Sequence, residues 1–235
     1  ITPKTTRPPL SPYRGCLFYH DMGTGKTLTG VHLALGFIQD YRLPLLGQLV
    51  QSGQGHLLGN FQSEDRGKVV FMFYKRLKPT WEKSVYRYLN ESYNMRQYFQ
   101  DYFYPDGSSG SDEIMEYVNQ SSAINFQKQK EEIAENDELF NEIKHFVIQI
   151  FIRDHFIFQT ANPSSTLISE LEARPLRHNL VIMDEIHNII GYIHSGVMNL
   201  PGKPPGKTGS HVYKWLLDSY DTKIVGLSGT PIINY

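Results

Sequence analysis

Cysteine is almost absent from this sequence, and so are long apolar segments. Cys16 is the single cysteine among 235 residues, which excludes an intrachain disulfide and a metal site built from cysteines. No apolar run approaches the roughly 20 residues that a membrane helix needs. The opening segment, ITPKTTRPPL, also lacks the apolar core of a signal peptide. We therefore expect an intracellular protein with no membrane partner.

An excess of either charge is lacking as well. The 23 Lys and Arg residues and the 24 Asp and Glu residues give a net charge of -1, so the whole chain exerts no general attraction on nucleic acid. Such binding would need a local basic surface or a part of the protein outside this chain. The chain begins with Ile1 rather than Met, and its last motif ends beside Tyr235. We therefore expect a fragment of a longer polypeptide.

What the sequence does contain is an alternation of apolar strand segments and amphipathic helical segments. Helical periodicity occurs between the strands and also covers residues 131–152, where the boundary with the next strand stays open because the run becomes uniformly apolar. This alternation predicts an α/β fold with a mainly parallel sheet flanked by helices. The predicted strands are residues 16–19, 69–74, 155–160, 180–183 and 223–227.

Two segments interrupt this pattern and are predicted to be insertions in a single domain spanning residues 1–235. The first, at about 42–67, is rich in Gly, Gln and Ser, and the second, at about 92–150, begins with a polar and aromatic stretch. A third segment, residues 196–209, is rich in Pro, Gly and Lys, and we expect no regular structure there.

The motif HDMGTGKT at residues 20–27 lies between a predicted strand and a predicted helix. This context is typical of a phosphate-binding loop, in which backbone amides and the positive helix end face a phosphate. Gly23 and Gly25 would let the backbone approach the ligand closely, Lys26 would neutralise the β- and γ-phosphates, and Thr27 would offer its hydroxyl to Mg²⁺. Met22 and Thr24 complete the predicted loop, and His20 stands where the strict pattern has Gly.

A second Gly-Lys-Thr occurs in PGKPPGKTG at residues 201–209. No predicted strand leads into it, and Pro204 and Pro205 remove amide donors where a phosphate cradle needs them. We interpret this second copy as a chance match.

The segment VIMDEIHNI at residues 181–189 ends an apolar strand with two adjacent carboxylates. Ligands of open α/β sheets bind at the carboxyl ends of the strands, so Asp184 and Glu185 are predicted to face the phosphates. Asp184 suits Mg²⁺, directly or through water, and Glu185 suits the base or positioner of the attacking water. The alternative interpretation is an ordinary solvated pair at the rim of the sheet.

Taken together, HDMGTGKT, DEIH and LSGTPIIN at residues 227–234 resemble motifs I, II and III of superfamily 2 helicases. The M-G-x-G-K-T core and the T-P-I-x-N ending resemble chromatin-remodelling ATPases and the helicase-like early transcription factor ATPases of large DNA viruses. The Ser-Pro-Tyr-Arg-Gly segment at 11–15 and the long insertions favour the viral type. The resemblance implies a P-loop NTPase of RecA-like fold, which binds ATP and Mg²⁺ and acts on nucleic acid, with DNA favoured over RNA.

The same resemblance implies roles for further residues. His187 would relay the nucleotide state to Ser228 and Thr230, while Lys75, Lys78 and Thr160 would contact the nucleic-acid backbone. For the last three, a solvated helix start and a capped turn are equally good interpretations. The family's adenine-reading glutamine has no counterpart in residues 1–38, so either it precedes Ile1 or Tyr13 and Arg14 hold the base by stacking.

The resemblance also sets expectations for the whole protein. Motifs IV to VI and their arginine fingers belong to a second RecA-like lobe that this chain lacks, so the chain alone is expected to hydrolyse ATP poorly. Expected partners are nucleic acid, that second lobe and subunits of a transcription complex. The expected location is the virion and host cytoplasm for a viral protein, and otherwise the nucleus.

Two other functions compete with this prediction. An assembly lobe that uses ATP binding as a switch would explain the insertion at residues 92–130, because long insertions often carry partner contacts. A GTPase or a small-molecule kinase is the other alternative. No N-K-x-D element follows the phosphate loop as a GTPase would require, and kinases usually lack the DEIH and SGTP pair.

Overall fold

A computed structural model describes residues 14–21, 23–44, 67–99, 136–161, 164–197 and 207–230. These residues form an α/β structure around a five-stranded sheet with the order β1-β5-β4-β2-β3. All four strand pairings are parallel, which confirms the sheet predicted from the alternation of strands and helices. The strands are β1 (Gly15–Tyr19), β2 (Val69–Phe73), β3 (Phe156–Thr160), β4 (Leu180–Asp184) and β5 (Lys223–Ser228).

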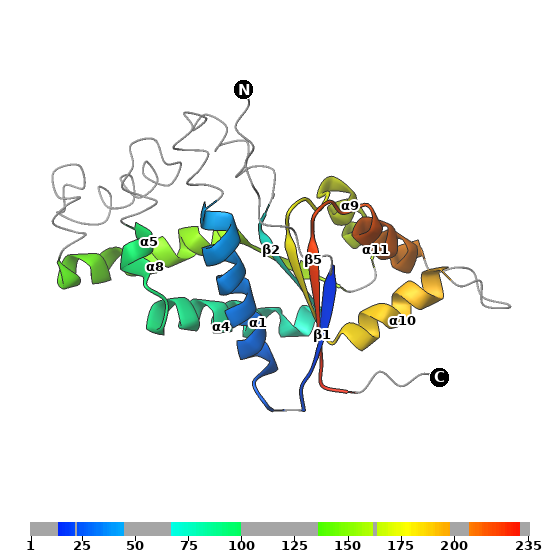
Figure 1. Cartoon of the computed structure of the whole chain (residues 1–235), viewed down its shortest axis with the longest axis horizontal. Helices are drawn as coiled ribbons and strands as arrows, with labels where there is room; N and C mark the ends of the chain where they lie inside the picture. Colours follow the sequence, from blue (N-terminus) through cyan, green and yellow to red (C-terminus); the bar gives the residue numbers. More distant parts are fainter. Residues whose placement is uncertain are drawn as a thin grey trace, which may run out of the picture.

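Helices cover both faces of this sheet (Figure 1). One face carries α1 (Lys26–Phe37) with its π-helical extension η1 (Ile38–Arg42), α4 (Lys78–Glu91), α5 (Met95–Tyr98) and α8 (Asp137–His155). The other face carries α9 (Ser165–Ala173), α10 (Ile186–Val197) and α11 (Lys207–Leu217). A short 3-10 turn, η2 (Lys75–Leu77), joins β2 to α4.

Each face has its own apolar core because side chains alternate along a strand. In β2, Val69, Phe71 and Phe73 belong to the core beneath α1, α4 and α8. Val70 and Met72 belong to the core beneath α9, α10 and α11. The central strands β2 and β4 are therefore buried along their whole length.

The first strand differs from what its sequence predicts. The short apolar run at residues 16–19 predicts a buried strand, yet Leu17 is 50% exposed and Tyr19 is 55% exposed. The reason is its place in the sheet, because among the described residues β1 pairs only with β5. Leu28, which the helical periodicity places on the apolar face of the following helix, is also half exposed.

Much of the second predicted insertion that the structure describes is packed on the sheet. Residues 137–150 form most of α8, whose apolar side chains belong to the larger core. Asn136 caps this helix, since its side chain accepts hydrogen bonds from the backbone N–H groups of Glu138 and Leu139. The helix ends at His155, so β3 begins one residue later than predicted.

Buried polar contacts join the end of α8 to η1. The Arg42 guanidinium donates from Nε to His155 Nδ1 over 2.8 Å and from an Nη atom to the Asp154 carbonyl over 2.8 Å. The Tyr98 hydroxyl lies 3.0 Å from His155 Nε2. Burial, together with the charges of Arg42 and Lys68, holds the pKa of His155 well below 6.5.

The segment at residues 196–209 was predicted to be irregular, which is wrong at both of its ends, because α10 extends to Val197 and α11 begins at Lys207. Residues 198–206 lie outside the described residues. The pair Asn162-Pro163 predicts the cap and first turn of the helix after β3, but both residues lie outside the described residues, and the cap in the structure is Ser164, which accepts from the Leu167 backbone N–H. Residues 45–66, which are most of the first predicted insertion at about 42–67, and residues 100–135 of the second also lie outside the described residues. Among the described residues, no helix has the length and apolar character needed to cross a membrane.

Candidate active site

The loop between β1 and α1 has the backbone that its glycines predict. Gly23 has a φ of 84° and Gly25 a φ of 90°. Both values lie in the left-handed region, which residues with a β-carbon disfavour. The Thr24 backbone N–H and hydroxyl both bind the Asp21 carbonyl, at 3.2 and 2.7 Å. Met22, also predicted for this loop, lies outside the described residues. The loop thus leads directly into α1 with Lys26 as its first residue.

The two carboxylates lie where β4 ends and α10 begins. Asp184 is the last residue of the buried strand and is only 5% exposed. Glu185 then takes a φ of 52°, an uncommon value for a residue with a side chain. At this turn the Glu185 carbonyl accepts a hydrogen bond from the Asn188 backbone N–H at 2.9 Å. Strained backbone of this kind is frequent at functional sites.

Lys26 joins the loop to both carboxylates. Its ammonium group hydrogen-bonds to Glu185 Oε1 across 159 residues of sequence and lies 3.6 Å from Asp184 Oδ1. The parallel sheet makes this possible, because β1 and β4 end at the same edge with only β5 between them. The predicted convergence of Lys26, Asp184 and Glu185 is therefore confirmed, and Thr27 follows Lys26 in the first turn of α1.

Asp184 has a further partner that the sequence did not reveal. The Trp81 indole N–H, from α4, donates to Asp184 Oδ2 over 3.0 Å, and the Glu185 backbone N–H donates to Oδ1 over 3.0 Å. Burial raises the pKa of Asp184, while the Trp81 hydrogen bond and the Lys26 charge oppose that rise. Trp81 was predicted only as part of an apolar helix face. The usable signal was that a buried indole N–H needs an acceptor.

His187 and the end of β5 form a second group beside Glu185. His187 Nδ1 lies 3.0 Å from Ser228 Oγ, 3.1 Å from Thr230 Oγ1 and 3.5 Å from Glu185 Oε2. The predicted grouping of His187, Ser228 and Thr230 is thus present in the structure. Ser228 also contacts the phosphate-loop segment, because its carbonyl accepts from the His20 backbone N–H at 3.0 Å.

The three predicted nucleic-acid residues lie beyond the ends of β2 and β3. Lys75 opens η2, Lys78 opens α4, and Thr160 is the last residue of β3. Lys75 is exposed and Lys78 is partly exposed. Lys78 pairs with Glu82 one helical turn away at 3.6 Å. The structure brings all three to the sheet edge that also carries Lys26.

Arg14 lies elsewhere, which contradicts its predicted stacking on a nucleotide base. It precedes β1, at the opposite end of that strand from the phosphate loop. Its guanidinium binds the Ser219 hydroxyl at 2.7 Å and the Ser219 carbonyl at 3.1 Å. Arg14 therefore ties the start of β1 to the end of α11. Tyr13, its predicted companion, lies outside the described residues.

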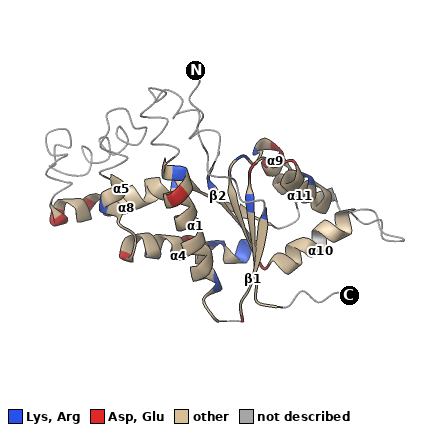
Figure 2. Ribbon diagram, viewed as in Figure 1, with Lys and Arg blue, Asp and Glu red and all other residues tan. Residues whose placement is uncertain are grey.

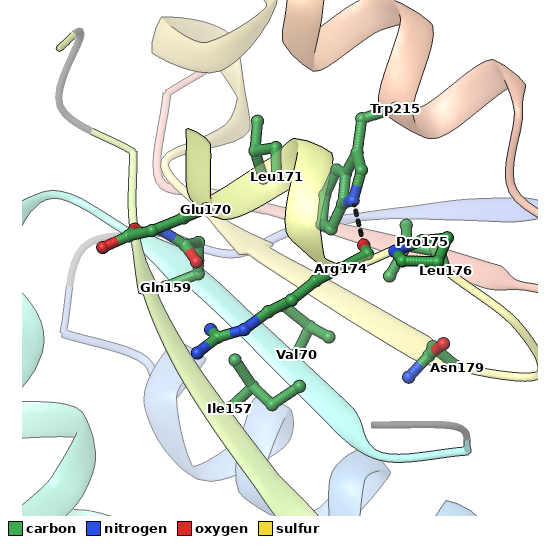
Figure 3. A pocket seen from close by; sticks show the side chains of 10 residues that line it. All are labelled: Val70, Ile157, Gln159, Glu170, Leu171, Arg174, Pro175, Leu176, Asn179 and Trp215. Carbon is green, nitrogen blue, oxygen red and sulfur yellow. Dashed lines mark hydrogen bonds between the residues drawn. The ribbon is translucent and has the colours of Figure 1, made fainter. Parts of the chain in front are cut away.

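Two hollows differ in their capacity for a ligand. One of about 640 Å³ reaches the loop from the side of α1 and α4, lined by residues that include Gly23, Gly25, Lys26, Thr27, Ser84 and Arg87. This volume is typical of small-molecule sites. The other, shown in Figure 3, lies between β2, β3, α9 and α11 and measures about 10 Å³. The Trp215 indole, bonded to the Arg174 carbonyl at 2.7 Å, helps to fill it, so it holds at most a water.

The oxygen donors at the site suit magnesium bound together with a nucleotide. Mg²⁺ is usually held by one or two carboxylates plus substrate phosphates rather than by a full protein cage. The Asp184 carboxylate and the Thr27 hydroxyl are such donors. The described part of the chain contains no group of three or more His, Cys, Asp or Glu side chains that could hold a metal by itself.

Comparison with known proteins leaves the geometry as the basis for a function. No protein-family model matches this chain, and no curated protein sequence matches it either.

Proposed function

We propose that this chain is the ATP-binding, RecA-like lobe of a superfamily 2 helicase-like motor that hydrolyses ATP and acts on nucleic acid, with DNA favoured over RNA. The contact of Lys26 with Asp184 and Glu185 carries the proposal. A five-stranded parallel sheet, in which one strand separates the loop strand from the carboxylate strand, is compatible with that fold.

In the proposed reaction, each residue has one task. The backbone amides of residues 23–26 and the start of α1 bind the phosphates. Lys26 exchanges Glu185 for the β- and γ-phosphate oxygens, which frees the Glu185 carboxylate. Glu185 then orients a water molecule for attack on the γ-phosphorus and accepts its proton as the bond to the β-phosphate oxygen breaks.

Asp184 and Thr27 would hold the magnesium ion, which would offset the negative charge of the phosphates when bound. The Trp81 hydrogen bond orients the Asp184 carboxylate and leaves its Oδ1 side facing Lys26. A fixed, buried carboxylate suits this role because it does not need to reorganise when the phosphates bind.

The wider assignment extends this proposal to the full-length protein. Ser228, Thr230 and His187 would report the state of the nucleotide to a nucleic-acid surface that includes Lys75, Lys78 and Thr160. A second lobe would supply the arginine fingers, and transcription-complex subunits would be the partners. The viral early transcription factor ATPases remain the favoured type, with the virion and host cytoplasm as the location.

Replacing Glu185 with Gln tests the proposed chemistry. The amide keeps the shape of the side chain but cannot accept a proton, so we expect ATP binding within about threefold of wild type and a loss of turnover of about 100-fold or more. Single-turnover hydrolysis of radiolabelled ATP at high protein concentration measures this even for a slow enzyme.

The matched control is Glu172→Gln on α9, which removes an exposed carboxylate 3.4 Å from His211. It should leave turnover unchanged. Wild-type turnover in the Glu185→Gln variant would remove Glu185 from the mechanism.

A further inference from the structure

A third hollow lies at the same sheet edge, between the end of β2 and the start of α10. It measures about 570 Å³ and is lined by Tyr74, Lys75, Arg76 and Asn188, and we call it the Lys75 pocket. Figure 2 shows the basic residues of this edge on the segment that joins β2 to α4. Two exposed cations and an amide around one hollow match the chemistry of a phosphate group, because both Arg and Lys bind phosphate oxygens well.

Asn188 links this pocket to the proposed active site. Its side-chain nitrogen lies 2.9 Å from His187 Nε2. An amide nitrogen can only donate, so Nε2 must accept, and a neutral imidazole then carries its proton on Nδ1. Nδ1 is the atom that faces Ser228, Thr230 and Glu185. Asn188 therefore selects the His187 tautomer that donates toward this group.

We propose that Asn188 is a positioning residue, which couples a nucleic-acid phosphate bound in the Lys75 pocket to Glu185. The inference rests on the proposed function, since the coupling acts on ATP chemistry at Glu185. The Asn188 amide has two N–H groups, so one can hold His187 while the other donates to a phosphate oxygen. A bound phosphate would thus fix the amide and, through it, the imidazole beside Glu185.

The size and surroundings of the pocket favour a chain of phosphates over a single free one. Its volume is several times that of a phosphate ion, and Lys78 and Thr160 continue the same edge beyond it. Successive backbone phosphates could therefore contact Lys75 and Arg76 together with the ends of the neighbouring strands. Contacts of this kind position a protein on nucleic acid without reading its sequence.

The first test measures the affinity for labelled DNA by fluorescence anisotropy, with duplex and single-stranded probes, over a range of salt concentrations. The double substitution Lys75→Gln and Arg76→Gln should weaken binding at least about tenfold and lower the salt slope by about 2, one for each lost phosphate contact. The matched control replaces two exposed lysines outside the pocket, Lys83→Gln and Lys214→Gln, and should change both quantities less. Equal losses of DNA affinity and of salt slope in the two double variants would contradict the assignment of a phosphate to the Lys75 pocket.

The second test addresses Asn188 with the variant Asn188→Leu, which keeps the approximate shape but has no N–H groups. In ¹⁵N-histidine NMR spectra, wild-type His187 should be the Nδ1–H tautomer, and the variant should lose that preference. His194→Gln, an exposed change on the same helix, should leave the His187 signal unchanged. An unchanged tautomer in Asn188→Leu would refute the positioning role.

The third test measures coupling as the ratio of DNA affinities with and without a non-hydrolysable ATP analogue. We expect a ratio different from one in wild type and close to one in Asn188→Leu, while ATP affinity is retained. A wild-type ratio in the variant would contradict the proposal. If wild type binds no ATP, the proposed function fails. The salt dependence of DNA binding still tests whether the Lys75 pocket binds phosphates, and the His187 tautomer still tests the hydrogen bond from Asn188. Inorganic phosphate that shifts the Asn188 side-chain signal as DNA does would overturn the assignment to a nucleic-acid backbone.

Discussion

The pKa values of two buried side chains, Asp184 and His155, are shifted in opposite directions. Burial raises the pKa of Asp184, which lies at the proposed active site and has a lysine, an indole and a backbone amide around it. Burial and nearby positive charge lower the pKa of His155, which is the last residue of α8 and contacts Arg42 and Tyr98. The first shift lies at the proposed active site, and the second accompanies a structural contact.

His155 predicts how stability depends on pH. The unfolded histidine gains a proton as the pH falls through about 6.5, but the folded one stays neutral because it is buried and lies beside the charge of Arg42. Its contribution is therefore present above pH 6.5 and is lost below it, by about 1.4 kcal/mol per pH unit at most. Urea unfolding between pH 7 and pH 5 should show a smaller decline for His155→Gln, whereas His194→Gln should decline as wild type does. An equal decline in all three proteins would contradict this account of the buried network.

At the scale of elements, the contact between α1 and α4 sets the position of Trp81. A β-carbon added at Gly30 would lie 2.6 Å from the Trp81 ring, so only glycine lets the two helices approach this closely. Gly36 lies on the same helix with nothing within 4 Å of such an atom. The two glycines therefore form a natural pair for comparison.

Gly30→Ala should destabilise the protein by about 1 to 3 kcal/mol through overpacking. Gly36→Ala should stabilise it by about 0.5 to 1 kcal/mol because alanine favours a helix. Urea unfolding followed by tryptophan fluorescence measures both effects. Since Trp81 holds Asp184, ATP affinity should also fall in Gly30→Ala only. Similar stabilities for the two variants would show that Trp81 has room to move.

Elements with one clear local signal were the ones that the sequence predicted well. The apolar runs at residues 69–74 and 180–183 predicted the strands β2 and β4, and Pro79 lies in the first turn of α4 as its fixed φ favours. Burial of β1 was predicted wrongly because an apolar run does not reveal that its strand lies at the edge of the sheet that the described residues form. The start of α11 was hidden by prolines and glycines just before Lys207.

At the scale of the whole molecule, the spacing of residues along the chain does not by itself show which side chains meet in the folded structure. The rule that ligands lie at the carboxyl ends of parallel strands was enough to predict the meeting of Lys26 with Asp184 and Glu185. It could not predict Trp81 or Asn188, whose side chains reach the site across packed helices and depend on tertiary contacts. It also could not show that Arg14 binds Ser219, because that contact joins residues 205 positions apart.

The duplicated Gly-Lys-Thr sequence provides the most direct test of the central claim, which is that Lys26 binds the phosphates of ATP. Both lysines follow a glycine and open a helix, and the structure places Lys26 against Asp184 and Glu185. Isothermal titration calorimetry with Mg²⁺ and ATP should show that Lys26→Ala weakens binding by about 30-fold or more, as the loss of a charged contact of at least 2 kcal/mol implies. Lys207→Ala should bind as wild type does. Unchanged affinity in Lys26→Ala, or an equal loss in Lys207→Ala, would contradict the account.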